Sequence, residues 1–279
     1  MSSAIQNELS GVHRTAFSAA ALRAAHTLFG AEPKIFRDDF ALPLAGMTRD
    51  EVAALAARVP PASAATCIVR SRFAEDRLAA ARGRVAQYVV LGAGLDSYAL
   101  RMGEGLGDLA VFEVDDPPFQ AWKRQKLQAL GLAPPRGLRF VACDFERTAL
   151  AAALAGSGFE AGAPCFVSWL GVTQYLTREA VAETLRWAGG RPAGSEIVLT
   201  FLESNAQALG LKASMAQTGV EVLSHFTPEE MTALLYEAGF AHVEHLTPDE
   251  ATERYFRGRA DGLIAPQIQR LVSATVGRR

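Results

Sequence analysis

The stretch from Gln87 to Ser97 constrains this chain more than any other. It reads Gln-Tyr-Val-Val-Leu-Gly-Ala-Gly-Leu-Asp-Ser, a β-branched run that ends at Gly92 and Gly94. Asp96 or Ser97 then stands where a helix N-cap belongs, because a short side-chain oxygen there accepts a hydrogen bond from the first turn. The pattern predicts a strand, a tight glycine turn and a helix start. Such a turn brings bare backbone and a positive helix end to a ligand at the carboxyl edge of a parallel sheet.

From residue 85 onward, short apolar runs alternate with helical segments. Strict alternation of strands and helices is typical of right-handed crossovers and of a doubly wound, mostly parallel sheet. Two late strands fit an antiparallel hairpin that completes a seven-stranded, Rossmann-like α/β fold. The expected strands are 86–91, 109–114, 138–142, 164–169, 196–202, 242–246 and 270–276, and the expected helices among the first five are 97–102, 119–130, 148–155 and 178–188.

We expect one compact unit with two additions to the α/β domain (84–279). Residues 1–83 are predicted to form a helical cap, with helices at 15–28, at about 51–59 before Pro60-Pro61, and at about 67–82. Residues 204–226 show no clean strand pattern and are long enough to form a lid over the sheet edge. The lid is followed by Thr227-Pro228-Glu229-Glu230, a capping box with proline at the first helical position, which opens a helix that closes at Gly239.

Composition disfavours several classes of function. The net charge of −2 and the pI near 6.2 provide no positive surface for nucleic acid or an anionic membrane. No apolar run approaches the roughly 18 residues of a membrane span and no basic-then-apolar leader begins the chain, so we expect a cytoplasmic protein. The three cysteines have no metal-ligand spacing and are expected to be reduced. His242 and His245 fall on opposite faces of a predicted strand, so no metal site is predicted.

Two acidic residues follow the glycine turn at the ends of successive strands. Asp115 comes 21 residues after Gly94, where an acid accepts hydrogen bonds from ribose hydroxyls. Asp144 ends the third strand beside Phe145, which suits an adenine amino group and its ring face. An adenosine site of this kind serves either S-adenosylmethionine or a nicotinamide dinucleotide. Ser97 replaces the third glycine of the dinucleotide motif, and the Asp96 carboxylate would oppose a phosphate, so both favour the sulfonium cofactor.

The motifs then form a recognisable set: Gly-Ala-Gly-Leu-Asp-Ser at 92–97, Phe-Glu-Val-Asp-Asp-Pro at 112–117, Cys-Asp-Phe at 143–145 and Gly-Val-Thr-Gln-Tyr-Leu-Thr at 171–177, with Arg-Ser-Arg-Phe at 70–73 ahead of them. This set resembles the leucine carboxyl methyltransferase family. It is most similar to the family's bacterial branch of S-adenosylmethionine-dependent O-methyltransferases. The similarity covers nearly the whole chain and implies a class I methyltransferase fold.

The resemblance also implies roles for individual residues. Arg70 matches the cap arginine that grips the methionine carboxylate of the cofactor, and Asp115 matches the ribose ligand. Asp144 with Phe145 flanks the adenine. Leu170 stands where eukaryotic members have a cofactor-contacting glutamate, so that contact is either lost or supplied by the Leu170 main chain. The candidate cofactor residues are Arg70, Gly92, Ala93, Gly94, Asp96, Glu113, Asp115, Asp144, Phe145, Trp169 and Leu170, with the Glu113 carboxylate expected to point at a polar neighbour.

The predicted function is methyl transfer from S-adenosylmethionine to a carboxylate or hydroxyl of a small or medium-sized acceptor. A carboxylate needs no base, whereas a hydroxyl needs one, and His225 in the lid and Glu203 after the fifth strand are candidates. Tyr175 is a candidate for lining the acceptor pocket. A non-catalytic nucleotide-binding protein and a nicotinamide-dependent oxidoreductase stay open as alternatives. A hydrophobic acceptor is suggested by the apolar lid residues Leu209, Leu211, Met215, Val220 and Leu223.

Overall fold

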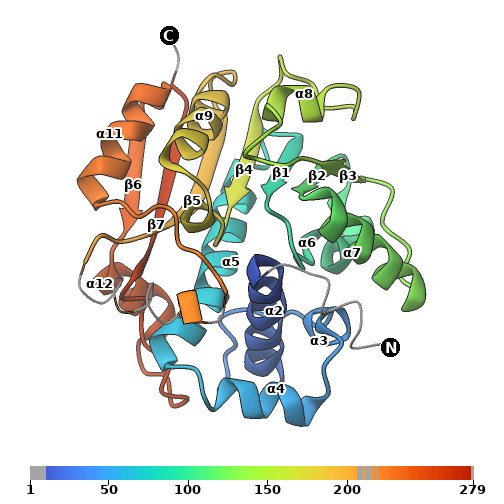
Figure 1. Cartoon of the computed structure of the whole chain (residues 1–279), viewed down its shortest axis with the longest axis vertical. Coiled ribbons are helices and arrows are strands. Elements are labelled where there is room, and N and C mark those ends of the chain that lie inside the picture. The colour runs from blue at the N-terminus through green and yellow to red at the C-terminus, as the bar shows by residue number, and fades with distance from the viewer. Residues whose placement is uncertain (1–10, 206–209, 211–214, 218, 278–279) are drawn as a thin grey trace.

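Seven strands form one sheet in the order β3-β2-β1-β4-β5-β7-β6 (Figure 1). The computed structural model describes residues 11–205, 210, 215–217 and 219–277. Strands β1 to β5 pair in parallel, and β7 runs antiparallel to β5 and β6. The predicted doubly wound sheet is confirmed, and the last strand lies inside it. The bounds are β1 (Gln87–Leu91), β2 (Ala110–Asp115), β3 (Leu138–Ala142), β4 (Cys165–Trp169), β5 (Glu196–Leu202), β6 (His242–Leu246) and β7 (Gln269–Thr275).

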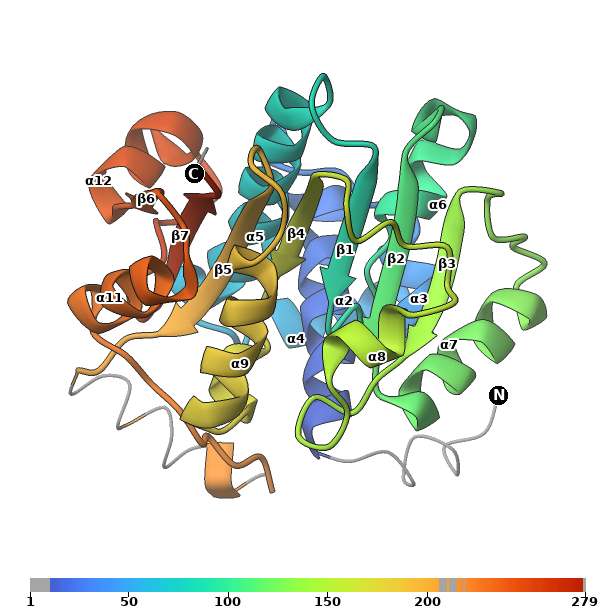
Figure 2. The ribbon, with the colours of Figure 1, turned by 90° about the horizontal axis from the view of Figure 1, so that it is seen from above.

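Helices cover both faces of the sheet (Figure 2). All five side chains of β1 are buried, because Tyr88 and Val90 pack on one face and Val89 and Leu91 on the other. A strand buried on both sides has a continuous apolar sequence, which is why the run before Gly92 predicted it so well. The covering helices are α5 (Pro61–Ala81) and α6 (Tyr98–Met102) on one face, and α8 (Leu150–Leu154), α9 (Arg178–Gly189) and α11 (Pro228–Ala238) on the other.

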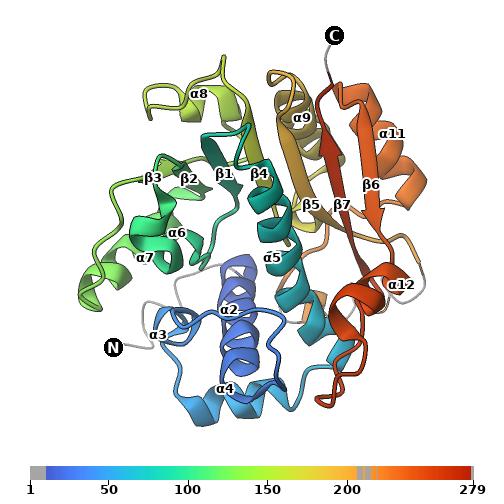
Figure 3. The same ribbon diagram turned by 180° about the vertical axis from the view of Figure 1, so that it is seen from behind.

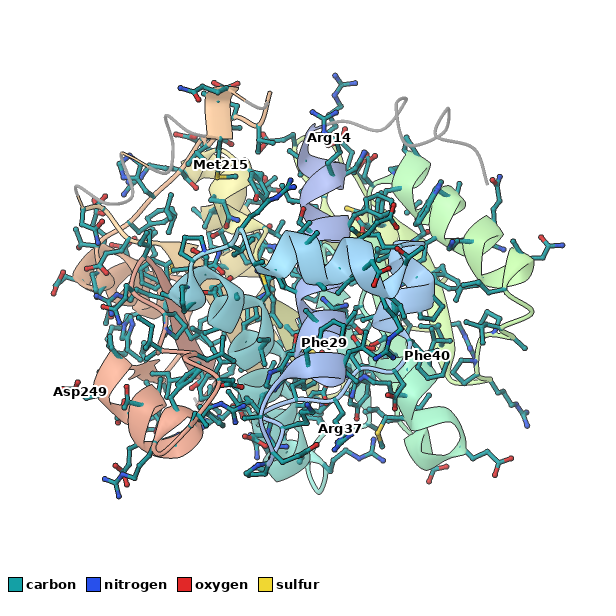
Figure 4. All side chains as sticks on the ribbon, turned by 90° about the horizontal axis from the view of Figure 1, so that it is seen from below. Arg14, Phe29, Arg37, Phe40, Met215 and Asp249 are labelled. Atoms are coloured by element: carbon teal, nitrogen blue, oxygen red, sulfur yellow. The ribbon has the colours of Figure 1, made fainter. Side chains whose placement is uncertain are left out.

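The cap helices α2 (Gly11–Phe29), α3 (Ala41–Ala45) and α4 (Arg49–Ala56) lie beyond the carboxyl ends of the parallel strands, below the sheet in Figure 1. Figure 4 looks onto this cap and shows Arg14 and Phe29 towards opposite ends of α2. Helix α5 instead runs along the sheet (Figure 3) and contributes to its core. It begins at Pro61 rather than near residue 67, because proline at the first helical position starts a helix as well as ending the one before it.

The lid segment (204–226) is described at residues 204–205, 210, 215–217 and 219–226, so Leu209 and Leu211 lie outside the described residues. Val220 is buried, whereas Leu223 is 43% exposed. The backbone of the lid is hydrogen-bonded to the turn after β4, where the Leu223 N–H donates to the Gln174 carbonyl at 2.8 Å. The Ser224 hydroxyl donates to the neighbouring Thr173 carbonyl at 2.8 Å. This end of the lid is therefore fixed to the edge of the sheet.

The remaining elements of the described residues are the 13-residue helix α7 (Pro117–Ala129) and the short elements η1 (Gly103–Leu106), η2 (Thr173–Tyr175), α12 (Pro248–Ala251) and η3 (Thr252–Phe256). Cys67, Cys143 and Cys165 form no disulfide. Within the described ranges, no group of three or more histidine, cysteine or acidic side chains could hold a metal ion. No single described helix is long and apolar enough to cross a membrane; α4 and α5 meet that test only as a pair bent by 117°.

Candidate functional site

A cavity of about 240 Å³ lies at the carboxyl edge of the sheet. The ends of β1 to β4 and the loops that follow them form its floor, and side chains between Val12 and Arg23 of α2 form its roof. Helix α5 closes one side with Arg70 and Ser71. The loops after parallel strands thus meet the cap at the place where open α/β sheets bind their ligands.

The glycine turn after β1 is held in a shape that only glycine adopts easily. Gly92 and Gly94 have φ of +63° and +50°. A Cβ at Gly92 would overlap the side chain of Val172, and one at Gly94 would lie 3.3 Å from the Cβ of Ala16. Arg23 on α2 donates to the Leu95 carbonyl at 2.7 Å, which fixes the far end of the turn. The backbone therefore forms the cavity wall directly.

Asp115 connects the end of β2 to this turn. Its carboxylate accepts hydrogen bonds from the backbone N–H of Gly94 and, at 2.8 Å, from that of Asp116. Burial raises the pKa of Asp115, and the two hydrogen bonds oppose that rise. A carboxylate offers about four lone-pair sites. Two remain for hydroxyl donors of a ligand in the cavity, which the Asp115 side chain lines.

Asp96 rather than Ser97 accepts the N–H bond at the start of α6. Its Oδ1 accepts from the Tyr98 N–H at 2.8 Å, whereas the Ser97 hydroxyl accepts from Arg101 at 3.0 Å. The Asp96 carbonyl accepts from Lys123 at 2.8 Å, which ties this loop to α7. Asp96 also lines the cavity, so a second carboxylate faces any ligand there.

The third strand contributes Asp144 and Phe145, which line the cavity together. Asp144 Oδ1 accepts from the Glu146 N–H at 3.0 Å, and Arg147 lies 3.6 Å from Oδ2. Ala93 and Leu170 line the same cavity. The structure thus brings these predicted residues together, and their contact with adenine stays a prediction.

Two predicted cofactor residues lie outside the cavity. Glu113 is buried beneath the floor, where its carboxylate pairs with Lys123 at 2.6 Å. Burial raises the Glu113 pKa to about 7, and Lys123 opposes that rise. The expectation of a polar neighbour is confirmed, and the placement among cavity residues is corrected because α7 covers this side of β2. The Trp169 side chain is fully buried in the core and does not line the cavity, and a contact between Trp169 and the cofactor stays a prediction.

The candidate bases His225 and Glu203 do not line this cavity, and a role for either as a base stays a prediction. The His225 ring contacts the Ser204 hydroxyl at 2.5 Å. Glu203 forms an ion pair with Arg270, because β7 runs beside β5 and brings that arginine alongside. Tyr175 does line the cavity.

Sequence reasoning missed His13 and Arg23 as cavity residues. The His13 ring stacks on Phe119 with centroids 5.0 Å apart, and its Nε2 lies 3.3 Å from the Asp116 carboxylate. Arg23 pairs with the buried Asp38 at 2.8 Å while it holds the glycine turn. Nothing in a helical pattern tells which residue faces a loop some 70 positions later, so no sequence signal marks either residue.

Solved structures share this architecture. A protein named as a methyltransferase from Thermobifida fusca YX matches with a TM-score of 0.61, over 94% of this chain and 94% of that one, at 16% identity. A DUF574 family protein from Streptomyces avermitilis matches with a TM-score of 0.58, over 92% and 97%, also at 16% identity. These likenesses show the fold alone. That fold is the class I methyltransferase fold.

The family follows from the sequence. The leucine carboxyl methyltransferase profile matches residues 16–189, and the chain belongs to that family. YktD of Bacillus subtilis, which carries the name of an S-adenosyl-L-methionine-dependent methyltransferase, is 37% identical over 189 residues, 64% of this chain and 62% of that protein. A Mycobacterium sp. (strain JLS) protein with a name of the same kind is 32% identical over 182 residues, 63% and 57%. The chain thus spans about three-fifths of the length of these relatives.

The cofactor in those names is S-adenosylmethionine, and the cavity fits its groups. Gly92 and Gly94 leave room that a side chain would fill. Asp115 keeps acceptor capacity for ribose hydroxyls. Among the residues that the structure describes, no carboxylate is paired with Arg70, so its charge suits the carboxylate of the cofactor's methionine part. The Asp96 carboxylate suits a cationic ligand better than a pyrophosphate.

Proposed function

We propose that the protein is an S-adenosylmethionine-dependent O-methyltransferase that methylates a carboxylate or hydroxyl oxygen of a small or medium-sized acceptor. The observation that carries the proposal is the convergence of the Gly92 turn, Asp115 and Arg70 on one cavity. One element supplies bare backbone, the second an anion and the third a cation, spaced along the edge of the sheet. A molecule with a hydroxylated sugar at one point and an anionic group at another matches that order.

Each end of the cofactor has residues to hold it. Asp115 would accept from the ribose hydroxyls, and Asp144 with Phe145 would flank the adenine. Arg70 would bind the methionine carboxylate. Leu170 has no side-chain acceptor for the cofactor's amino group, which leaves that contact to main-chain carbonyls near the end of β4.

The protein's contribution to the reaction is alignment and exclusion of water. The bound cofactor supplies a methyl group on a positively charged sulfur, already activated for attack by an oxygen lone pair. Helix α2 roofs the cavity, and Leu170, Val172 and Leu176 line it with apolar surface. A site of this kind holds two reactants in line and keeps water from competing for the methyl group.

The acceptor decides whether a base is needed. A carboxylate attacks in its ionised form and loses no proton. A hydroxyl must lose one, and His13, close to Asp116, is the imidazole that lines the described cavity, whereas His225 lies elsewhere. The apolar lining near Tyr175, from Val172 and Leu176, favours a hydrophobic acceptor.

The test is calorimetric titration of the protein with S-adenosylmethionine, S-adenosylhomocysteine and NAD in parallel. We expect binding of the first two and none of NAD. Mass spectrometry then follows methyl transfer to panels of carboxylic acids and phenols. Binding of NAD alone would overturn the proposal. Cofactor binding without transfer to any oxygen acceptor would favour a non-catalytic nucleotide-binding protein.

A further inference from the structure

Arg70 differs from its neighbours on α5 in what it bonds. Arg72 pairs with Asp76 at 2.6 Å and Arg77 with Glu196 at 2.6 Å, so both are neutralised by carboxylates. The partner of Arg70 is a neutral amide: its Nη1 donates to Gln269 Oε1 at 3.3 Å. The guanidinium is thereby held from β7 while its full positive charge stays available to the cavity.

Gln269 is itself held in place. Its amide N–H donates to Gln174 Oε1 at 3.5 Å, and the Gln174 amide donates in turn to the Gly171 carbonyl at 3.2 Å. Gln174 is only 7% exposed, and its main-chain carbonyl accepts from Leu223 of the lid. The two glutamines thus form a short relay that runs from η2 to Arg70 and is anchored at its buried end.

Gly171 makes room for the arginine that this relay holds. A Cβ at Gly171 would overlap the Nη1 atom of Arg70, and its φ of +76° disfavours any side chain. The Gly171 N–H donates to the Thr200 hydroxyl at 2.7 Å, which fixes the peptide against β5. The guanidinium therefore packs against bare backbone on one side and is hydrogen-bonded to Gln269.

We propose that Gln269 is a positioning residue that aims the Arg70 guanidinium at the carboxylate of the bound cofactor. This inference rests on the proposed function, in which Arg70 binds that carboxylate. The amide suits the task because it accepts a hydrogen bond without neutralising the arginine. A glutamate at the same place would pair with Arg70 and compete with the cofactor for it.

The experiment compares two ligands on three variants. S-adenosylhomocysteine carries the carboxylate, and methylthioadenosine is the same nucleoside thioether without the amino-acid part. Gln269→Glu should weaken S-adenosylhomocysteine binding about 10- to 100-fold, because Arg70 would pair with the new carboxylate and lose its charge-assisted contact with the ligand. Gln269→Leu should weaken it about 3- to 10-fold, because only the hydrogen bond that holds Arg70 is lost. Methylthioadenosine affinity should change less than about twofold. Gln267→Glu is the matched control, since Gln267 is exposed, outside the cavity and two residues away; it should change neither.

Thermal unfolding of each variant separates folding from binding, and Gln269→Leu adds no charge should the glutamate variant fold poorly. Equal losses for the two ligands, or no loss for either, would overturn the positioning role while wild-type cofactor binding keeps the proposed function intact. Equal affinity of the wild type for the two ligands would also overturn the positioning role, because Arg70 would then not hold the carboxylate. A wild type that binds neither ligand would overturn both proposals.

Discussion

The strongest test of the site is Asp115→Ala. In the folded protein this carboxylate accepts from the Gly94 and Asp116 N–H groups. Both N–H groups border the cavity, so water can replace the lost acceptor, and removal of a buried charge with a raised pKa offsets part of the cost. We therefore expect unfolding free energy to fall by only about 1–2 kcal/mol.

The effect on binding should be much larger. Two hydrogen bonds from ribose hydroxyls to a carboxylate contribute about 1.5–3 kcal/mol each, or about 3–6 kcal/mol together. The dissociation constant for S-adenosylhomocysteine should rise by a factor of about 150 to 25,000. Because adenosine keeps both hydroxyls, it should lose as much affinity. Calorimetry measures both ligands, and urea unfolding measures stability.

Asp108→Ala is the matched control for this substitution. Asp108 is an exposed aspartate just before β2, outside the cavity, and its removal deletes the same charge. The control should bind both ligands as the wild type does. If Asp115→Ala bound S-adenosylhomocysteine within about threefold of wild type, the assignment of Asp115 to the ribose would be refuted.

Three further predictions concern the supports of the site. Lys123→Met leaves Glu113 buried without its cation and should cost about 3–5 kcal/mol in urea unfolding, partly recovered when Glu113→Gln is added; a loss below about 1 kcal/mol would contradict this. Gly92→Ala should lower unfolding free energy by about 1–3 kcal/mol, and Val172→Ala should relieve the overlap but not the positive φ, so full rescue would argue against backbone strain. Burial lowers the pKa of His26 to about 4, so the folded protein keeps this ring neutral while the unfolded chain protonates it near pH 6.5. Stability should fall as pH drops from 6.5 toward 4, by about 2 kcal/mol at pH 5, and His26→Gln should flatten that profile in denaturant titrations.

The sheet was predictable because its signals are local. β3, β5 and β6 have the bounds that were predicted for them, and the glycines after β1 mark the turn. The start of α5 could not be predicted, because Pro60-Pro61 can both end one helix and begin the next. That ambiguity is a property of proline, and only packing against the sheet resolves it.

The residues of the candidate site likewise divide into those that local sequence predicts and those that depend on tertiary packing. Asp115 ends β2 and Asp144 follows β3, and strand order in a parallel sheet brings such ends together. Glu113 lies in β2 and Glu203 directly follows β5, but each carboxylate is paired with a cation, Lys123 or Arg270, supplied by a distant element. His13 was missed for the converse reason, because it reaches the cavity only through tertiary packing of α2.

The alanine-rich roof helix also bears on how fast a ligand can come and go. Ala16 packs over Gly94, and Arg23 of the same helix holds the Leu95 carbonyl, so α2 is fastened to the very turn that it covers. We expect exchange of a ligand beneath it to involve lifting of the first turns of α2. We expect residence times to follow the frequency of that opening, so that substitutions in α2 alter association and dissociation rates together while the equilibrium constant changes little.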